Sequence, residues 1–178
     1  MPGKRFMAVL LAALFLVLGG VVVRAEQGEV EYKVKAAFLL NFARFAAWPE
    51  SAAAEPRFAL CVLGDDPFGP ALAGIESKEI GGKAILLRHL ASAADGIDQC
   101  RLLFVGKSEQ GNLGRILSTI AGQPILTVSD IEGFAKAGGV FEFKDRDGRL
   151  SFIINNTKAK ASGMHISASL LNLAVEVL

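Results

Sequence analysis

Two adjacent carboxylates, Asp65 and Asp66, follow directly after the apolar run Phe58–Leu63. Paired carboxylates at the end of a strand can hold Mg²⁺, as in phosphoryl-accepting receiver domains, because open α/β sheets place their ligands at that edge. Such a site also needs an acceptor aspartate after the third strand, and Gly106–Lys107 occupies that position. The alternative that we favour is a helix start, with Asp66 as the cap and Pro67 in the first turn.

A second group of residues, Ser129, Asp130 and His165, could on paper form a nucleophile with its base. No Gly-x-Ser-x-Gly elbow surrounds the serine, so a structural role for His165 is favoured. Two histidines and two cysteines make a poor zinc site, which needs four converging ligands. The chain also has no dinucleotide-binding or Walker-type glycine motif. We therefore expect no catalytic residue, no metal and no cofactor.

The N-terminus has the order of segments that is typical of a secretory signal peptide. Lys4 and Arg5 precede an uncharged apolar run, Phe6–Val23, and Ala25 offers a cleavage site. An uncleaved membrane anchor is the alternative, because the run approaches the roughly 20 residues of a bilayer span. The small residues at the end of the run favour cleavage. We predict a signal peptide over residues 1–25, and either alternative places the rest of the chain outside the cytoplasm.

The only two cysteines, Cys61 and Cys100, both lie beyond the predicted cleavage site. In an oxidising compartment an even number of cysteines suggests a disulfide. If the two are paired, they close a loop of about 40 residues, which stabilises the fold by roughly 3–4 kcal/mol. Two buried free thiols in adjacent strands are the alternative. Export favours the disulfide.

The remaining residues, 26–178, suit one domain with a core of its own. The formal net charge is +1, so no clustered basic surface points to nucleic acid. A helix is predicted over Glu29–Trp48. Its expected apolar stripe is made of one valine and three phenylalanines at spacings of four, four and three: Val34, Phe38, Phe42 and Phe45.

Short apolar runs that end in turn residues predict strands covered on both faces by helices. The expected strands are Phe58–Leu63, Ala84–Leu87, Cys100–Val105 and Ile125–Val128. Helices are expected over Asn112–Ala121, Asn155–Ala161 and Ser167–Val177, with a shorter one over Asp66–Leu72. The fold class is therefore α/β, a three-layer sandwich. Its open, mostly parallel sheet carries an antiparallel C-terminal hairpin at one edge.

The hairpin is predicted from two alternating runs joined by a turn that contains Asp147-Gly148. Alternation places Phe141, Phe143, Phe152 and Ile154 on one face, and Glu142, Ser151 and Ile153 on the other. Which face points outward stays open. An apolar side chain left exposed there would mark an interaction surface, because soluble monomers rarely expose large apolar patches. The candidates for partner binding are Phe141, Phe143, Phe152 and Ile153.

Five segments of the chain resemble the YfiR family of periplasmic proteins. They are VKAAFLLNFARFAAWP (34–49), CVLGDDPFG (61–69), ILTVSDIEGFA (125–135), FIIN (152–155) and ISASLLNLA (166–174). The resemblance implies a negative regulator that binds the outer region of a membrane diguanylate cyclase of YfiN type. Release of that cyclase raises cyclic di-GMP and promotes biofilm formation.

The resemblance also implies a Cys61–Cys100 disulfide that supports folding, and a partner surface towards the hairpin, Phe141–Ile153 here. Some relatives have a second cysteine pair around the hairpin, but Phe134–Phe143 contains none. Redox sensing by a second bridge is therefore not expected here.

Three hypotheses follow from the sequence, and the first is favoured: a non-catalytic periplasmic regulator. The second is a small-ligand sensor with a crevice formed by Asp65, Asp66, Ser129 and Asp130. The third is an esterase-like enzyme that uses Ser129 and His165. The oligomeric state stays open, with a homodimer as one alternative.

Overall fold

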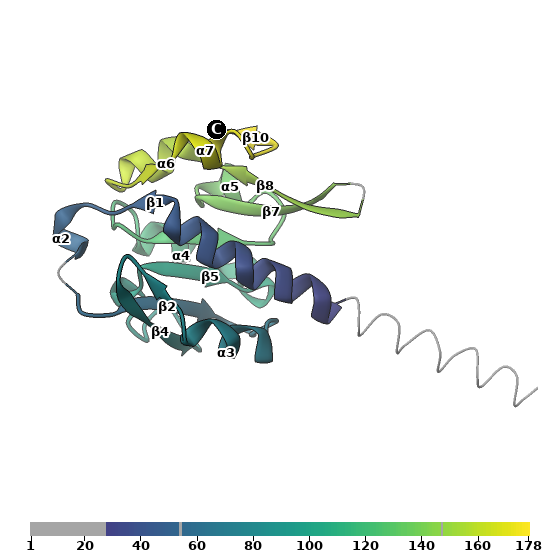
Figure 1. The fold of residues 1–178 in the computed structure, drawn as a ribbon. Coiled ribbons are helices and arrows are strands. Elements are labelled where there is room, and N and C mark those ends of the chain that lie inside the picture. The colour runs from purple at the N-terminus through teal and green to yellow at the C-terminus, as the bar shows by residue number, and fades with distance from the viewer. Residues whose placement is uncertain (1–27, 54, 147) are drawn as a thin grey trace, which may run out of the picture.

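The computed structural model describes residues 28–178 apart from residues 54 and 147. It begins with a long helix over residues 28–44, the first helix, which crosses one face of the sheet (Figure 1). The predicted signal peptide, residues 1–25, lies outside the described residues. Within the described part, no helix is both long and apolar enough to cross a membrane.

The described strands form an eight-stranded sheet with the order β10-β8-β7-β6-β5-β2-β4-β3. Strands β4, β2, β5, β6 and β7 run parallel, while β8 is antiparallel to β7 and β3 is antiparallel to β4. The bounds are Phe58–Leu63 (β2), Glu79–Ile80 (β3), Lys83–Leu90 (β4), Leu102–Val105 (β5), Leu126–Ser129 (β6), Phe141–Arg146 (β7), Arg149–Ile154 (β8) and Glu176–Val177 (β10). This confirms the mostly parallel α/β sheet with a C-terminal hairpin.

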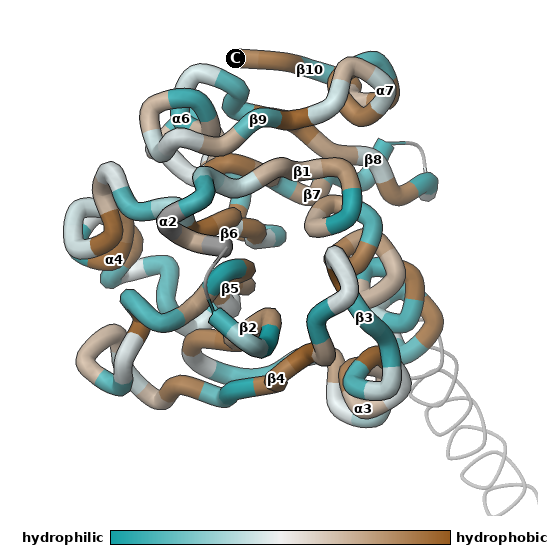
Figure 2. Tube along the Cα trace, turned by 60° about the vertical axis from the view of Figure 1, so that its left-hand side comes forward, coloured by the Kyte–Doolittle hydropathy of each residue, from teal (hydrophilic) through white to brown (hydrophobic). Residues whose placement is uncertain are grey.

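Two apolar cores on opposite faces make the sheet the middle of three layers. Successive residues of β2 alternate between them: Leu60 and Val62 belong to the first core, Cys61 and Leu63 to the second. The first helix and α3 (Pro70–Glu76) cover the first core, and η1 (Ile97–Gln99), α4 (Leu113–Thr119) and α5 (Phe134–Ala137) cover the second. Figure 2 shows α3 and α4 on opposite sides of β2 and β5. Burial on both faces explains why β2 and β5 are continuous apolar runs.

Shorter elements complete the domain. They are β1 (Ala46–Ala47), α2 (Glu50–Ala53), η2 (Lys107–Asn112), α6 (Asn156–Ala161), β9 (His165–Ile166) and α7 (Ala168–Leu171). Strands β1 and β9 pair antiparallel in a separate two-stranded sheet. This pairing ends the first helix at residue 44, four residues earlier than the sequence predicted.

The buried face of the first helix also differs from the predicted stripe. Val34 and Phe45 are 41% and 46% exposed, although Phe42 is fully buried and stacks on Phe141 with ring centroids 4.1 Å apart. The buried positions lie further round the helix, at Lys35, Ala36, Leu39, Leu40 and Ala43. Lys35, which is not part of the predicted stripe, therefore lies on the buried face of the helix.

The base of the hairpin is buried on both faces, so none of the side chains predicted as candidates for partner binding is exposed in the free chain. The aromatic face lies in the first core beneath the first helix, and its members are Phe141, Phe143, Phe152 and Ile154. On the other face, Ile153 is only 5% exposed, and residues 133–135 cover Glu142. The covering segments are distant in the sequence, so local alternation could not reveal them.

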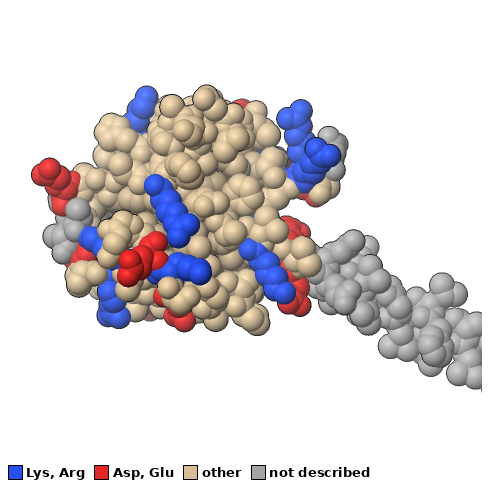
Figure 3. All heavy atoms as spheres, in the orientation of Figure 1, with Lys and Arg blue, Asp and Glu red and all other residues tan. Residues whose placement is uncertain are grey.

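The C-terminal helix predicted over Ser167–Val177 is also too long. Only α7 is helical, and the chain then extends along the hairpin, where the Val175 N–H donates to the Phe152 carbonyl at 3.0 Å. Strand β10 pairs parallel with β8 and forms the sheet edge, so the hairpin lies one strand inside it. On the face seen in Figure 3, few charged side chains lie over these C-terminal elements at the top of the view.

Candidate functional site

The predicted disulfide between Cys61 and Cys100 is present, with Cα atoms 5.9 Å apart. Both cysteines are fully buried in the second core. The sulfur of Cys61 comes from β2, the direct neighbour of β5, and Cys100 lies two residues before β5 begins. A bridge so deeply buried supports the fold and offers no exposed thiol chemistry.

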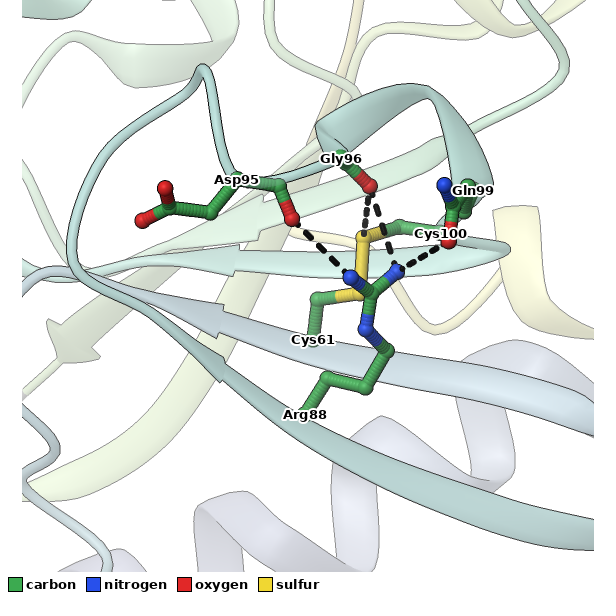
Figure 4. Close-up of a disulfide and its surroundings, with 6 residues drawn as sticks. All are labelled: Cys61, Arg88, Asp95, Gly96, Gln99 and Cys100. Carbon is green, nitrogen blue, oxygen red and sulfur yellow. Dashed lines mark hydrogen bonds between the residues drawn. A yellow bond between two sulfur atoms is a disulfide. The ribbon is translucent and has the colours of Figure 1, made fainter.

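Arg88 of β4 fixes the loop that leads into the bridge (Figure 4). Its guanidinium donates to the carbonyl oxygens of Asp95 and Gly96 at 2.9 and 3.3 Å, and to Oε1 of Gln99 at 3.0 Å. This planar group satisfies several acceptors of one loop at once, which a lysine could not do in the same geometry.

The paired carboxylates organise turns. Oδ1 of Asp66 accepts the Phe68 N–H at 2.8 Å, and its Oδ2 lies 3.0 Å from Nε2 of His89. Helix α3 begins only at Pro70, so the predicted cap at Asp66 stabilises a turn before the helix instead. Asp65 is exposed, and its N–H donates to the Ser108 hydroxyl. No group of three His, Cys, Asp or Glu side chains that could hold a metal occurs among the described residues.

Ser129, Asp130 and His165 do not form a catalytic triad. The buried Ser129 hydroxyl donates to the Val105 carbonyl at 2.7 Å and accepts the Ile131 N–H at 3.0 Å. These bonds tie β6 to β5 and fix the loop that follows. His165 lies in β9 beyond the C-terminal end of the first helix, whereas Asp130 contacts the N-terminal half of that helix.

Asp130 is the centre of a buried polar cluster. Its Oδ2 accepts the Tyr32 hydroxyl and the Lys35 ammonium, each at 2.7 Å, and the Lys107 ammonium lies 3.8 Å away. Lys35 also pairs with Glu31 at 2.6 Å. The side chains of Lys35 and Asp130 are only 3% and 5% exposed. The other carboxylate oxygen, Oδ1, is buried and has no hydrogen-bond partner among the described residues.

The charges in this cluster hold Asp130 ionised. Burial on its own raises the pKa of Asp130, but hydrogen bonds from Lys35 and Tyr32, with the charges of Lys35 and Lys107, outweigh it and lower the pKa below its ordinary value. Burial and the bond to Asp130 raise the pKa of Tyr32. Tyr32 therefore stays a hydrogen-bond donor, and Asp130 stays an acceptor.

A cavity of about 590 Å³ opens beside the cluster, between the first helix, the hairpin and the start of η2. We call it the crevice. Its charged lining consists of Glu31, Lys35, Lys107, Asp130, Lys144 and Asp145, and its apolar lining of Val30, Val34, Phe143 and Leu150. Of the four residues predicted to form a crevice, only Asp130 lines it.

Tyr32, Lys35 and Lys107 were missed by sequence reasoning. A signal for the first two was present, because Tyr32, Ala36, Leu39 and Ala43 form an apolar stripe at spacings of four, three and four. Lys35 adjoins that stripe. A buried lysine needs a carboxylate partner, but nothing in the sequence identifies Asp130 as that partner.

Glu142 is another charged residue that the structure buries. It is 1% exposed, and its two carboxylate oxygens accept the N–H groups of Gly133 and Ala135 at 3.1 and 3.0 Å. Both oxygens are therefore satisfied, so Glu142 acts as a clamp between β7 and the start of α5.

Three apolar side chains in the C-terminal segment are exposed instead of buried. Leu173, Val175 and Val177 are 70%, 42% and 47% exposed, and we call them the C-terminal apolar surface. They follow α7 and run beside the edge of the hairpin. This places exposed apolar groups next to the predicted partner region, on side chains that the sequence had assigned to a helix.

A family model described as YfiR/HmsC-like matches residues 32–175. The chain belongs to the YfiR/HmsC-like family. The match runs from Tyr32 in the first helix, through both cysteines and the hairpin, to Val175. It therefore confirms the family resemblance drawn from the five sequence segments, and this YfiR/HmsC-like domain accounts for most of the chain.

Proposed function

We propose that this protein is an exported, non-catalytic regulator that binds the outer region of a membrane diguanylate cyclase of YfiN type. By holding that cyclase inactive, it lowers cyclic di-GMP and biofilm formation. The observation that carries the proposal is the family match over residues 32–175, because resemblance to the YfiR family implies a periplasmic regulator. The buried disulfide is consistent with an oxidising compartment.

The C-terminal apolar surface is our candidate for the contact with the cyclase. Leu173, Val175 and Val177 are exposed, whereas Met164, Ile166 and Leu170 of the same C-terminal segment are buried. Exposed apolar side chains are unfavourably hydrated in the free protein. Contact with an apolar partner surface would remove them from water, which is favourable in free energy. The scarcity of charge over these elements in Figure 3 also favours an apolar contact.

The backbone beneath this surface is well supported. Strand β10 pairs with β8, the Val175 N–H donates to Phe152, and the Leu178 N–H donates to Ile154. The apolar side chains are therefore presented by a fixed segment, which lowers the entropy cost of binding. The hairpin would act as the support of the interface, with its own phenylalanines inside the core.

The proposal is tested by charged substitutions in this surface. Leu173→Asp and Val175→Asp should each weaken cyclase binding by about 2 kcal/mol, or roughly 30-fold, and raise cellular cyclic di-GMP. Val30→Asp is the matched control, because Val30 is 59% exposed but lies on the first helix. Cyclic di-GMP, co-purification with the cyclase and the melting temperature are measured for each variant.

The control separates binding from folding. A folded Leu173→Asp variant that still represses the cyclase would exclude this surface. Equal derepression by Val30→Asp would mean that the effect is not specific to the C-terminal segment. Failure of the wild-type protein to co-purify with any cyclase, together with unchanged cyclic di-GMP on its deletion, would exclude the regulatory function itself.

A further inference from the structure

A cavity of about 220 Å³ lies at the amino ends of β2, β4 and β5, whereas the crevice lies at the carboxyl ends of β5 and β6. We call it the basic pocket, because its charged lining consists of Arg44, Arg57, Lys83 and Arg101. These residues come from the end of the first helix, the residue before β2, the start of β4 and the residue before β5. The fold therefore brings four cationic side chains from distant parts of the chain to one concave surface.

The three arginines of the basic pocket are not neutralised by the protein. Arg44, Arg57 and Arg101 form no ion pair with any residue that the structure describes. Nε of Arg101 donates to the Ala52 carbonyl at 3.1 Å, which leaves its two terminal amino groups available. A guanidinium carries five N–H donors in a planar fork, so most of the donors around this pocket are unused by described residues.

The lining of the basic pocket also contains no carboxylate. Glu55 and Glu79, close to it in the sequence, are exposed and do not line it. The fourth cation, Lys83, donates to the backbone carbonyl of Glu55 at 2.7 Å. A cleft that is lined by one sign of charge and has walls of low dielectric constant focuses the electric field of those charges. The basic pocket should therefore attract anions.

The walls of the basic pocket are apolar. Phe58 and Ile80 are each 5% exposed, and Ala43 is 1% exposed. Trp48 packs edge-on against Phe58, with ring centroids 5.3 Å apart, and its indole N–H donates to the Pro124 carbonyl at 3.0 Å. This aromatic wall is thus held in place by the protein, which lowers the entropy cost of packing a ligand against it.

The size and chemistry of the basic pocket together restrict its ligand. An apolar cavity of roughly 150 Å³ holds a benzene ring, so about 220 Å³ has room for an apolar body of about six to eight carbons. A guanidinium pairs in a bidentate manner with carboxylate and phosphate oxygens. We propose that the basic pocket binds a small organic anion. The arginines hold its carboxylate or phosphate head group, and its apolar body packs against Trp48 and Phe58.

The first test asks whether both parts of such a ligand are needed. Calorimetry on the purified protein with hexanoate, benzoate and hexyl phosphate should detect binding of at least one, and the stronger ligand identifies the head group. Hexanol and benzyl alcohol lack the charge, while acetate and inorganic phosphate lack the apolar body. Each of these should bind at least about tenfold more weakly. Absence of binding by all three organic anions, or equal affinity for the uncharged alcohols, would overturn the proposal.

The second test removes the proposed cationic partners one at a time. Arg44→Gln and Arg57→Gln should each lower the affinity for the bound anion about tenfold. Both arginines are exposed, so both variants should fold, and their melting temperatures check this. Arg149→Gln is the matched control, because Arg149 is an exposed arginine of β8 outside the basic pocket. Affinities that are the same in all three variants and the wild type would overturn the proposal.

The third test locates the ligand. Trp48 is the only tryptophan of the chain, so tryptophan fluorescence reports on the basic pocket alone. An apolar body that displaces water from the indole should shift its emission to shorter wavelength. Binding in the calorimeter without a change in this emission would place the anion elsewhere and refute the site. These measurements need no cyclase, so they succeed or fail independently of the proposed function.

Discussion

The crevice and the C-terminal apolar surface depart from ordinary burial in opposite directions. In the crevice, the charged Lys35 and Asp130 are 3% and 5% exposed. In the C-terminal apolar surface, Leu173 is 70% exposed and Val177 is 47% exposed. Soluble proteins usually bury leucine and valine and expose lysine and aspartate. Both regions lie on the same sheet, one near the ends of its central strands and the other at its β10 edge.

The two departures have different physical consequences. A buried charge is tolerated only while its partners stay in place, so the crevice should influence the stability of the free domain. An exposed apolar side chain contributes little to that stability, so its effect should emerge only when a partner covers it. Substitutions in the two regions should therefore separate folding from partner binding.

The largest effect is expected at Asp130. Asp130→Ala leaves Lys35 buried with only the half-exposed Glu31 as its partner, and should lower the free energy of unfolding by about 3–5 kcal/mol. Urea denaturation measures this loss. Asp65→Ala is the control, because Asp65 is exposed and should change stability by less than about 0.5 kcal/mol.

A double variant sharpens the interpretation of that result. Lys35→Met with Asp130→Ala removes both charges and should recover part of the stability lost by Asp130→Ala alone, because no unpaired buried charge remains. Purely additive losses would mean that the two side chains act independently, contrary to their 2.7 Å contact.

The features that could be predicted from the sequence are those that depend on local pattern or on composition. The run Phe58–Leu63 was predicted as a strand and is β2 with the same bounds. The prediction was possible because a strand that is buried on both faces is a continuous apolar run. The disulfide was predictable because export and an even cysteine count restrict the possibilities. Both predictions depend on local pattern or composition.

The remaining features depend on contacts between distant segments. Lys35 is buried because Asp130, 95 residues later in the chain, receives its ammonium. The hairpin phenylalanines are buried because the first helix covers them, although the alternation correctly placed Phe141 and Phe143 on one face. Val177 looked helical in sequence, but pairing with β8 makes it a strand residue. Tertiary contacts override local propensity at each of these positions.

Acid should reduce the contribution of the crevice to the free energy of unfolding, because that contribution depends on the ionised Asp130. The C-terminal apolar surface consists of Leu173, Val175 and Val177, whose side chains do not titrate. The pKa of Asp130 is lower in the folded protein than its ordinary value of 3.8, so the unfolded chain binds this proton first as the pH falls. The contribution of Asp130 is fully present above the ordinary pKa and is lost as the pH falls through the lower folded pKa. Tyr32, Lys35 and Lys107 are the groups that face the carboxylate.

This pH dependence is measured as a difference. The unfolding free energies of the wild type and of Asp130→Asn are compared from about pH 6 to about pH 2, where other carboxylates titrate in both proteins. The gap between the two curves should narrow as the pH falls. A constant gap would mean that the charge of Asp130 contributes no stability, and that only its shape matters.

The smallest effect is expected at the C-terminal apolar surface in the free protein. Val177→Thr keeps the shape of the side chain and adds a hydroxyl that water can solvate, because Val177 is 47% exposed. The free energy of unfolding should therefore change by less than about 0.5 kcal/mol. Val128→Thr is the matched control, since Val128 is fully buried in β6, and an unsatisfied hydroxyl there should cost about 1–3 kcal/mol. Equal losses from the two substitutions, measured by urea denaturation, would show that Val177 is packed in solution. Its side chain would then be unavailable to a partner. The expectation that the C-terminal apolar surface contributes little to the stability of the free domain would be wrong.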